Sequence, residues 1–133
     1  MIFQKYSGKI PSNYDDLIKM PGIGDYTAAA ILSIGYNLPF FAVDGNFIRV
    51  FSRLFKISGT RCETTKAIKS TLSKFDVEHY GDFNQAVMDL GRTICKTKNP
   101  HCSLCPISHW CLAYKNSSIQ EFPTKYPTKA KPI

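Results

Sequence analysis

The apolar positions along this chain recur mostly at the three- and four-residue intervals of amphipathic helices. Strict alternation of apolar and polar residues, which a half-buried strand requires, is not found over any convincing stretch. The pattern therefore predicts an all-α fold. Five helices are predicted, at about 13–19, 25–36, 45–57, 63–75 and 83–94.

Residues typical of helix ends and turns support these boundaries. Ser12 with Asp15 resembles a capping arrangement before the first helix, and Asp44 is a good N-cap for the third. The prolines, serines and lysines after Tyr114 are typical of a linker. We therefore divide the chain into a helical core at 1–91 with a turn at 20–24, a cysteine-rich segment at 92–114 and a basic linker at 115–133.

Composition narrows the class of protein. Apolar residues make up 44% of the 133 residues, which is enough to build a core. No run approaches the roughly 20 apolar residues that a membrane span needs, and 1–8 lacks a signal-peptide core. We expect a cytoplasmic, nucleoid-associated protein without a membrane partner.

The charge is uneven along the chain. Ten Lys and Arg face nine Asp and Glu up to residue 91, whereas seven face one from residue 92 onward. The net charge of +7 is thus concentrated in the last third. Such clustering fits either a solvated basic tail or a polyanionic partner such as nucleic acid.

Four of the five cysteines crowd into seventeen residues, with the spacing Cys-x6-Cys-x2-Cys-x5-Cys. In a chain without a secretory signal, this crowding indicates metal binding. Thiolates select zinc, copper(I) or iron–sulfur clusters. Only one tight Cys-x-x-Cys pair is present, whereas zinc ribbons usually have two, so the spacing favours a cluster over zinc. The candidate ligands are Cys95, Cys102, Cys105 and Cys111, and Cys62 is interpreted as an ordinary thiol.

Two segments could bind phosphate groups. The turn at 21–24 leads into a helix N-terminus, where free N–H groups favour an anion, although it could also be a plain corner between helices. The loop between the first two candidate ligands carries cations, which bind phosphates or merely solvate the loop. The candidate contacts are Gly22, Ile23, Gly24, Lys96, Lys98 and His101.

Four motifs, in order, resemble one known family. Segment 20–28 (MPGIGDYTA) resembles the helix-hairpin-helix of the DNA glycosylase superfamily, and 43–46 (VDGN) resembles its catalytic aspartate segment. Segment 83–91 (FNQAVMDLG) resembles the helix before its cluster loop. The cysteine spacing is similar to that of the endonuclease III and adenine glycosylase branches. The resemblance implies a partial helix-hairpin-helix glycosylase fold with a C-terminal [4Fe–4S] cluster loop.

Two sequence positions indicate which branch of the family the chain resembles. Bifunctional relatives place a lysine two residues after the second hairpin glycine, where this chain has Tyr26, and they tend to read Val-Asp-Thr-His instead of Val-Asp-Gly-Asn. Both differences resemble the monofunctional adenine glycosylases. The resemblance implies base-excision repair, by hydrolysis of the N-glycosidic bond of adenine opposite 8-oxoguanine or guanine in double-stranded DNA. It implies that Asp44 stabilises the positive charge on the sugar, and that Asn46 and Tyr26 line the pocket.

The general acid of the family, a glutamate in a Leu-Gln-Gln segment, has no counterpart here, and Glu63, Glu78 and Glu121 lie outside any matching context. We therefore expect an N-terminally truncated chain that also lacks the 8-oxoguanine-reading domain and is inactive alone. A separate chain supplying the missing N-terminal helices is a candidate partner. The alternatives are a non-catalytic, DNA-binding iron–sulfur module from a split or truncated gene and, more weakly, an endonuclease III-like glycosylase/lyase.

Overall fold

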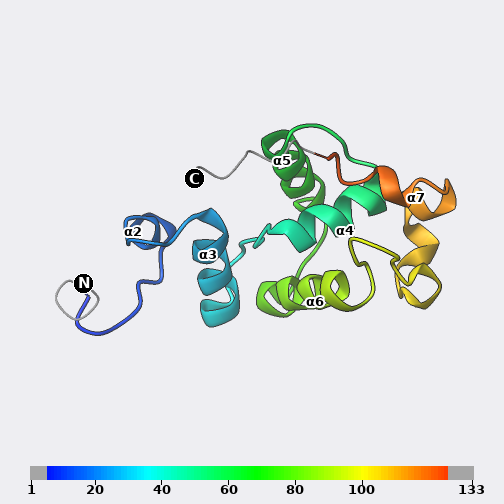
Figure 1. Ribbon diagram of the computed structural model, residues 1–133. Coiled ribbons are helices and arrows are strands. Elements are labelled where there is room, and N and C mark those ends of the chain that lie inside the picture. Colours follow the sequence, from blue (N-terminus) through cyan, green and yellow to red (C-terminus); the bar gives the residue numbers. More distant parts are fainter. Residues whose placement is uncertain (1–5, 126–133) are drawn as a thin grey trace.

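The computed structural model describes residues 6–125, and within them the chain is helical without strands (Figure 1). The predicted all-α fold and its five helices are confirmed. The helices are α2 (Tyr14–Ile18), α3 (Asp25–Ala30), α4 (Gly45–Phe55), α5 (Arg61–Leu72), α6 (Tyr80–Thr93) and α7 (Leu112–Lys115). A π-helical turn, η1 (Ile31–Gly35), continues α3, and 3-10 turns lie at η2 (Cys102–Leu104), η3 (Ser108–Trp110) and η4 (Ile119–Glu121).

Helix α4 is the centre of the main body. In Figure 1, α5 lies on one side of it and α6 on the other, while the α2–α3 hairpin and the cysteine segment lie at opposite ends. Phe47 of α4 is fully buried, and full burial of such a ring stabilises the fold by roughly 2–3 kcal/mol. Ile68 from α5 and Val87 from α6 complete the same core.

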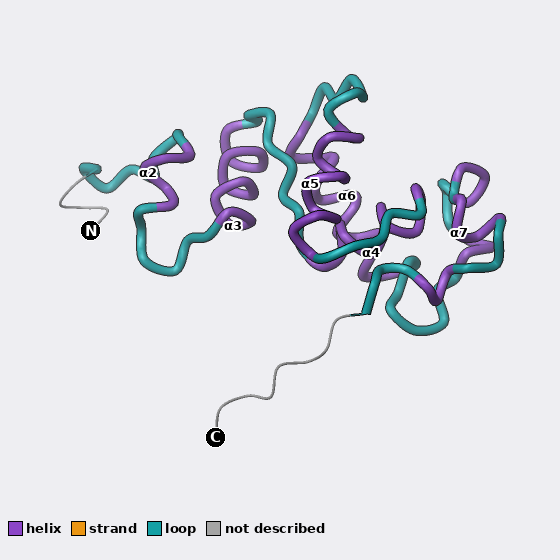
Figure 2. Tube along the Cα trace, turned by 90° about the horizontal axis from the view of Figure 1, so that it is seen from above, coloured by secondary structure: helices purple, strands orange, loops and turns teal. Residues whose placement is uncertain are grey.

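The α2–α3 hairpin has a small core of its own, made by Leu17, Met20, Ala28 and Leu32. Figure 2, a view from above, shows the hairpin set to one side of the bundle that α4, α5 and α6 form. The hairpin therefore meets the main body over a limited area, mainly where η1 packs on α6.

Side-chain caps explain where the helices begin. The Asp44 carboxylate accepts a hydrogen bond from the Phe47 N–H at 2.9 Å, which confirms the predicted cap of α4. The predicted cap of the first helix is wrong. Asn13, and not Ser12, caps α2, because its side-chain oxygen accepts from the Asp16 N–H at 2.9 Å.

Helix α6 begins at Tyr80, three residues before the predicted start. The prediction missed this start because Gly81 lies near it, and glycine is a poor helix former. A Cβ atom at this position would lie 2.7 Å from the Ser33 carbonyl oxygen, so the close approach of η1 to α6 requires a glycine inside the helix. Tertiary packing thus extends α6 beyond its intrinsic preference.

The last described residues, 115–125, fall in the segment that composition marks as a linker. They include a 3-10 turn, and Phe122 keeps only 9% of its surface exposed. This part of the segment packs on the main body, while 126–133, like 1–5 at the other end, lies outside the described residues. None of the helices in the described part of the chain is long and apolar enough to cross a membrane.

Candidate active site and cysteine centre

Asp44 stands at the N-terminus of α4, with each carboxylate oxygen bound by a different donor. Oδ1 accepts from the Phe47 N–H, and Oδ2 accepts from Asn46 Nδ2 at 3.1 Å. A carboxylate held in this way has a fixed orientation without a cation directly opposite it. It can therefore face a positive charge that develops on a bound substrate.

Asn46 is the first link in a path of hydrogen bonds that leads away from Asp44. Its Oδ1 accepts from Arg49 Nη2 at 2.8 Å. Arg49 also donates to the carbonyl oxygens of Gly91, at 2.6 Å, and Cys95, at 2.7 Å. Burial lowers the pKa of the Arg49 guanidinium, as expected for a cation partly removed from water. The candidate catalytic carboxylate is thus connected to the backbone of a candidate metal ligand.

Gly91 allows this arrangement to be compact. A Cβ atom there would lie 2.9 Å from the Asn46 Cβ and 3.0 Å from its Oδ1. The absence of a side chain lets α6 approach the start of α4 closely enough for the Gly91 carbonyl to reach Arg49.

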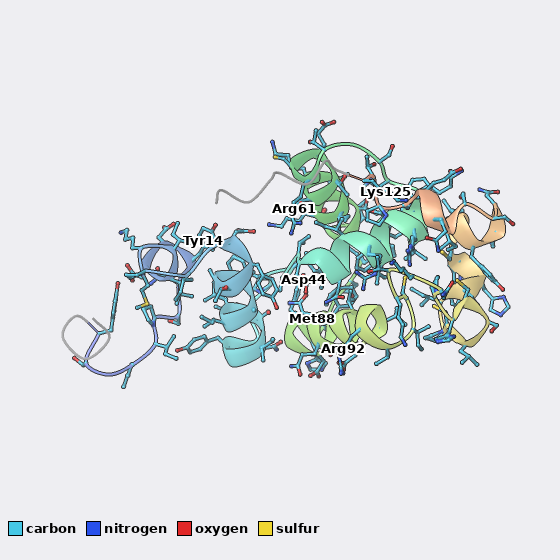
Figure 3. The ribbon with its side chains drawn as sticks, in the orientation of Figure 1. Tyr14, Asp44, Arg61, Met88, Arg92 and Lys125 are labelled. Atoms are coloured by element: carbon cyan, nitrogen blue, oxygen red, sulfur yellow. The ribbon has the colours of Figure 1, made fainter. Side chains whose placement is uncertain are left out.

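Tyr26 projects from α3 and remains 38% exposed. Its hydroxyl lies 3.7 Å from the Met88 sulfur of α6 in a weak hydrogen bond. Figure 3 labels Asp44 near the end of α4 that is closest to α3, and Met88 on α6 just below it in that view. The contact with Met88 thus joins Tyr26 to α6, and no contact between the side chains of Tyr26 and Asp44 is found within residues 6–125.

The hairpin turn is open to solvent. Gly22 has a φ of +81°, a conformation that glycine adopts most readily, and no atom lies within 4 Å of a Cβ built on Gly22 or Gly24. Gly24 is the N-cap residue of α3. Space is thus available beside the turn for another molecule, and the phosphate contact through Gly22, Ile23 and Gly24 stays a prediction.

Asp25, next to the turn, is tied to two other helices. Its carboxylate accepts from the Tyr14 hydroxyl at 2.9 Å and pairs with Lys69 of α5 at 3.1 Å. Burial alone would raise the pKa of Asp25, but these two partners outweigh burial and lower it. The pair anchors the hairpin to α5.

Four cysteines line one pocket between α4 and the loops that follow α6; they are Cys95, Cys102, Cys105 and Cys111. Burial raises the pKa of the Cys102 thiol, and the charges of the other three cysteines act in the same direction. Burial likewise raises the pKa of Cys105. These mutual effects reflect how near the four sulfurs are to one another.

The thiols are not drawn together around a point. Among residues 6–125, no three His, Cys, Asp or Glu side chains lie close enough to hold a single metal ion. Tetrahedral ligands about 2.3 Å from one zinc ion would lie roughly 4 Å apart. An iron–sulfur cube, in which each thiolate binds a different iron, needs wider spacing. The donor set, four thiols that line one pocket, is the set that holds an iron–sulfur cluster.

The cationic loop between the first two cysteines points outward. Lys96, Lys98 and His101 are all exposed, while the His101 N–H donates to the Ile94 carbonyl oxygen at 3.0 Å and closes the loop. Asn99 at its tip has a φ of +50°. The loop can present its cations to solvent or to an anion, and their role in binding DNA stays a prediction.

The sequence did not single out Arg49, Arg53 or Asn84. Arg53 is 2% exposed and donates to Cys95 Sγ at 3.4 Å. Asn84 is fully buried and donates to Ser33 Oγ at 2.8 Å and the Phe40 carbonyl at 2.9 Å. A polar residue beside the apolar stripe of α6 was the available indication for Asn84, whereas Arg49 and Arg53 lie on the polar side of α4 and gave no such signal.

Comparison with known proteins agrees with this geometry. Residues 5–34 match the model of the helix-hairpin-helix motif. An adenine DNA glycosylase of Buchnera aphidicola subsp. Baizongia pistaciae is 39% identical over 117 residues, which cover 87% of this chain and 33% of the relative. One from Arabidopsis thaliana is 42% identical over 131 residues, covering 92% and 21%.

A solved structure of a non-covalent endonuclease III–DNA complex superposes with a TM-score of 0.71 at 30% identity. The match covers 88% of this chain and 54% of that one. The chain thus spans about a third or less of these two adenine DNA glycosylases and about half of the endonuclease III chain. The hairpin, the fold and these similarities agree with the resemblance seen in the sequence, and the chain belongs to the helix-hairpin-helix superfamily of DNA glycosylases.

Proposed function

We propose that this chain carries the aspartate-bearing part of an adenine DNA glycosylase active in base-excision repair. The substrate would be double-stranded DNA with adenine opposite 8-oxoguanine or guanine, and the reaction would be hydrolysis of the N-glycosidic bond. A nucleoid-associated location in the cytoplasm follows from such a substrate. The observation that carries the proposal is the Asp44 carboxylate held between Phe47 and Asn46.

The geometry suits that reaction in a specific way. A target base must leave the duplex before chemistry on it is possible. As the glycosidic bond breaks, positive charge develops on the sugar, and a fixed carboxylate lowers the energy of that state. Asp44 would supply this charge, Asn46 would keep it oriented, and Tyr26 would line the pocket from the hairpin. With a tyrosine at position 26, no amine is available there to form a Schiff base.

The four cysteines would hold a [4Fe–4S] cluster, whose contribution when bound is to fix the loop at 95–111. The four thiols that line one pocket, with only one tight Cys-x-x-Cys pair among them, support this cofactor over zinc. Lys96, Lys98 and His101 would then form a rigid surface for DNA phosphates, together with the turn at 22–24.

Within residues 6–125, no glutamate forms a hydrogen bond with Asp44, and no general acid is assigned among them. Glu63 is engaged in the cap of α5, where its Oε1 accepts from the Thr60 hydroxyl at 2.9 Å. This observation favours a second candidate function, a DNA-binding iron–sulfur module without catalysis of its own. The acid could also arrive on a separate chain that supplies the N-terminal helices.

One experiment separates these functions. The chain, loaded with iron and sulfide, is incubated with an A:8-oxoguanine duplex, alone and with the segment that precedes the matched residues in the Buchnera relative. We expect salt-sensitive binding in both cases and adenine release only with the added segment. Asp44→Asn should abolish release, whereas Asp89→Asn, on the exposed part of α6, should not.

Three outcomes would contradict the proposal. Adenine release by the chain alone would refute its predicted inactivity, and binding without release in the mixture would favour the non-catalytic module. A covalent DNA adduct after borohydride treatment would favour the endonuclease III-like branch, because only a Schiff base is trapped by the reduction.

A further inference from the structure

Arg53 is a buried cation whose partners include no carboxylate. Its side chain donates to three carbonyl oxygens, those of Lys96 at 2.8 Å, Phe122 at 3.0 Å and Thr97 at 3.3 Å. Its fourth partner is the Cys95 sulfur at 3.4 Å. Both ion pairs found within residues 6–125 join other residues.

Such a position is unfavourable for an isolated charge. Carbonyl oxygens satisfy the N–H groups of a guanidinium, but they carry no net charge to balance it. A buried charge is normally paired, because removal from water costs several kcal/mol otherwise. The nearest groups able to carry negative charge are the thiols in the same pocket. Cys95 accepts from the side chain of Arg53, and the Cys111 thiol donates to its backbone carbonyl at 3.5 Å.

An iron–sulfur cluster bound to the four cysteines would balance the positive charge of Arg53. Four thiolates bring four negative charges, which an iron–sulfide core cancels only in part. An arginine on the wall of that pocket would then lie against an anion and no longer beside neutral thiols. A hydrogen bond from a cation to a ligand sulfur also stabilises the more negative, reduced state of a cluster.

We propose that Arg53 is the buried counter-cation of the iron–sulfur cluster and clamps the cluster loop to the C-terminal segment. The inference rests on the cofactor proposed above. It assigns Arg53 two jobs, which are to balance the charge of the loaded site and to fix the carbonyls of Lys96 and Thr97 relative to Phe122. Arg53 is thus a positioning residue for the loop that carries Lys98 and His101.

The test compares Arg53→Met, which removes the charge at similar volume, with Arg53→Lys, which keeps the charge but loses the planar fork. Arg92→Gln is the matched control, because Arg92 is an arginine at the end of α6, next to the cysteine segment, with 72% of its side chain exposed. Each protein is loaded with iron and sulfide under anaerobic conditions. Loss of visible cluster absorbance to a chelator and the midpoint potential of the cluster are then measured.

We expect Arg53→Met to lose its cluster roughly 10- to 100-fold faster than the parent, as is typical when a residue supporting metal ligands is removed. Its midpoint potential should fall below that of the parent, because the reduced state loses a cation. Arg53→Lys should also lose its cluster faster, yet keep a potential close to that of the parent. Arg92→Gln should match the parent in both measurements.

The thermal midpoints of the loaded and metal-free forms provide a further readout. If Arg53 is a counter-cation, Arg53→Met should lower the thermal midpoint of the loaded form more than that of the metal-free form. In the metal-free protein the substitution removes an unbalanced buried charge, which offsets part of the loss. Equal losses in both forms, or an unchanged potential, would overturn the proposal and leave Arg53 as a structural clamp. If Arg53→Met does not fold, the test rests on Arg53→Lys. A midpoint potential of Arg53→Lys that differs clearly from that of the parent would then overturn the proposal as well.

These outcomes are distinct from failure of the cofactor proposal. A parent chain that takes up zinc in preference to iron and sulfide would refute the cluster itself. A parent that retains the cluster no better than Arg53→Met would refute the role of Arg53 alone.

Discussion

The two close approaches of α6 should respond differently to an added methyl group. Gly81→Ala and Gly91→Ala are matched substitutions, because both positions lie in the same helix. Each gains about 0.5–1 kcal/mol in helix preference from the loss of glycine. Any difference between the two variants must therefore come from what the new Cβ atom meets.

At Gly81 the obstacle is backbone. The new atom would lie 2.7 Å from the Ser33 carbonyl oxygen and 3.0 Å from the Ile34 Cα, and neither can rotate away. Overpacking costs about 1–3 kcal/mol, and a backbone clash belongs in the upper half of that range. After the gain in helix preference, we expect a net loss of about 1–2 kcal/mol in unfolding free energy.

At Gly91 the obstacle is the Asn46 side chain, whose Cβ would lie 2.9 Å from the new atom and is fixed to α4, while its amide group can turn only by giving up its bonds to Asp44 and Arg49. Each such bond contributes about 0.5–1.5 kcal/mol. Gly91→Ala should therefore also lose stability, by up to about 2.5 kcal/mol after the gain in helix preference, and Asp44 loses one of its two donors. Adenine release in the complemented assay should fall far more than stability does.

Urea unfolding followed by circular dichroism, with every protein in the same metal state, gives the stability order. Gly45→Ala is the control, because nothing lies within 4 Å of a Cβ built there. It should be at least as stable as the parent. A Gly81→Ala variant as stable as Gly45→Ala would refute the close approach of η1 to α6, and with it the placement of the hairpin.

The remaining predictions concern charge. Asp44→Asn should keep the helix cap and nearly full stability, whereas Asp44→Ala should cost about 1 kcal/mol; both should lower adenine release in the complemented assay by roughly 100-fold or more. The pKa of Asp25 is lowered on folding, so its contribution to stability should be present above the unfolded pKa and be lost as the pH falls through the folded pKa. Asp25→Asn and Lys69→Met should both weaken this loss of stability in acid, measured by unfolding at a series of pH values. An unchanged pH dependence would contradict the pairing. Replacing Lys96 and Lys98 by alanine should reduce the slope of log binding constant against log salt by up to about 2 in anisotropy measurements with duplex DNA, and an unchanged slope would remove these lysines from the interface.

Local sequence rules predicted much of the fold because they concern neighbours in the chain. The cap at Asp44 and the apolar spacing of α4 depend on residues within one or two turns, and the structure confirms both. The rules failed where partners distant in sequence decide. Gly81 stands inside a helix because η1 passes beside it, fifty residues away in sequence.

The sequence likewise predicted only some of the residues of the candidate site. The spacing of the four cysteines indicated the metal site, whereas the catalytic role of Asp44 was implied by the family resemblance; both assignments stay predictions. Arg49 and Arg53 were overlooked, because an arginine on a helix is normally interpreted as a solvent-exposed residue until its hydrogen-bond acceptors are known. Most of those acceptors are backbone carbonyl groups, which no side-chain pattern encodes.

The narrow attachment of the α2–α3 hairpin has a consequence for the order in which the molecule opens. The hairpin is held to the body mainly by η1 against α6, by the three hydrogen bonds of Asn84 and by the Lys69–Asp25 pair. In native-state hydrogen exchange, the amides of α2 and α3 should therefore exchange as one unit and earlier than those of α4. Undocking can change the distance between the turn at 22–24, which we propose contacts DNA, and Asp44 while the core around α4 remains protected.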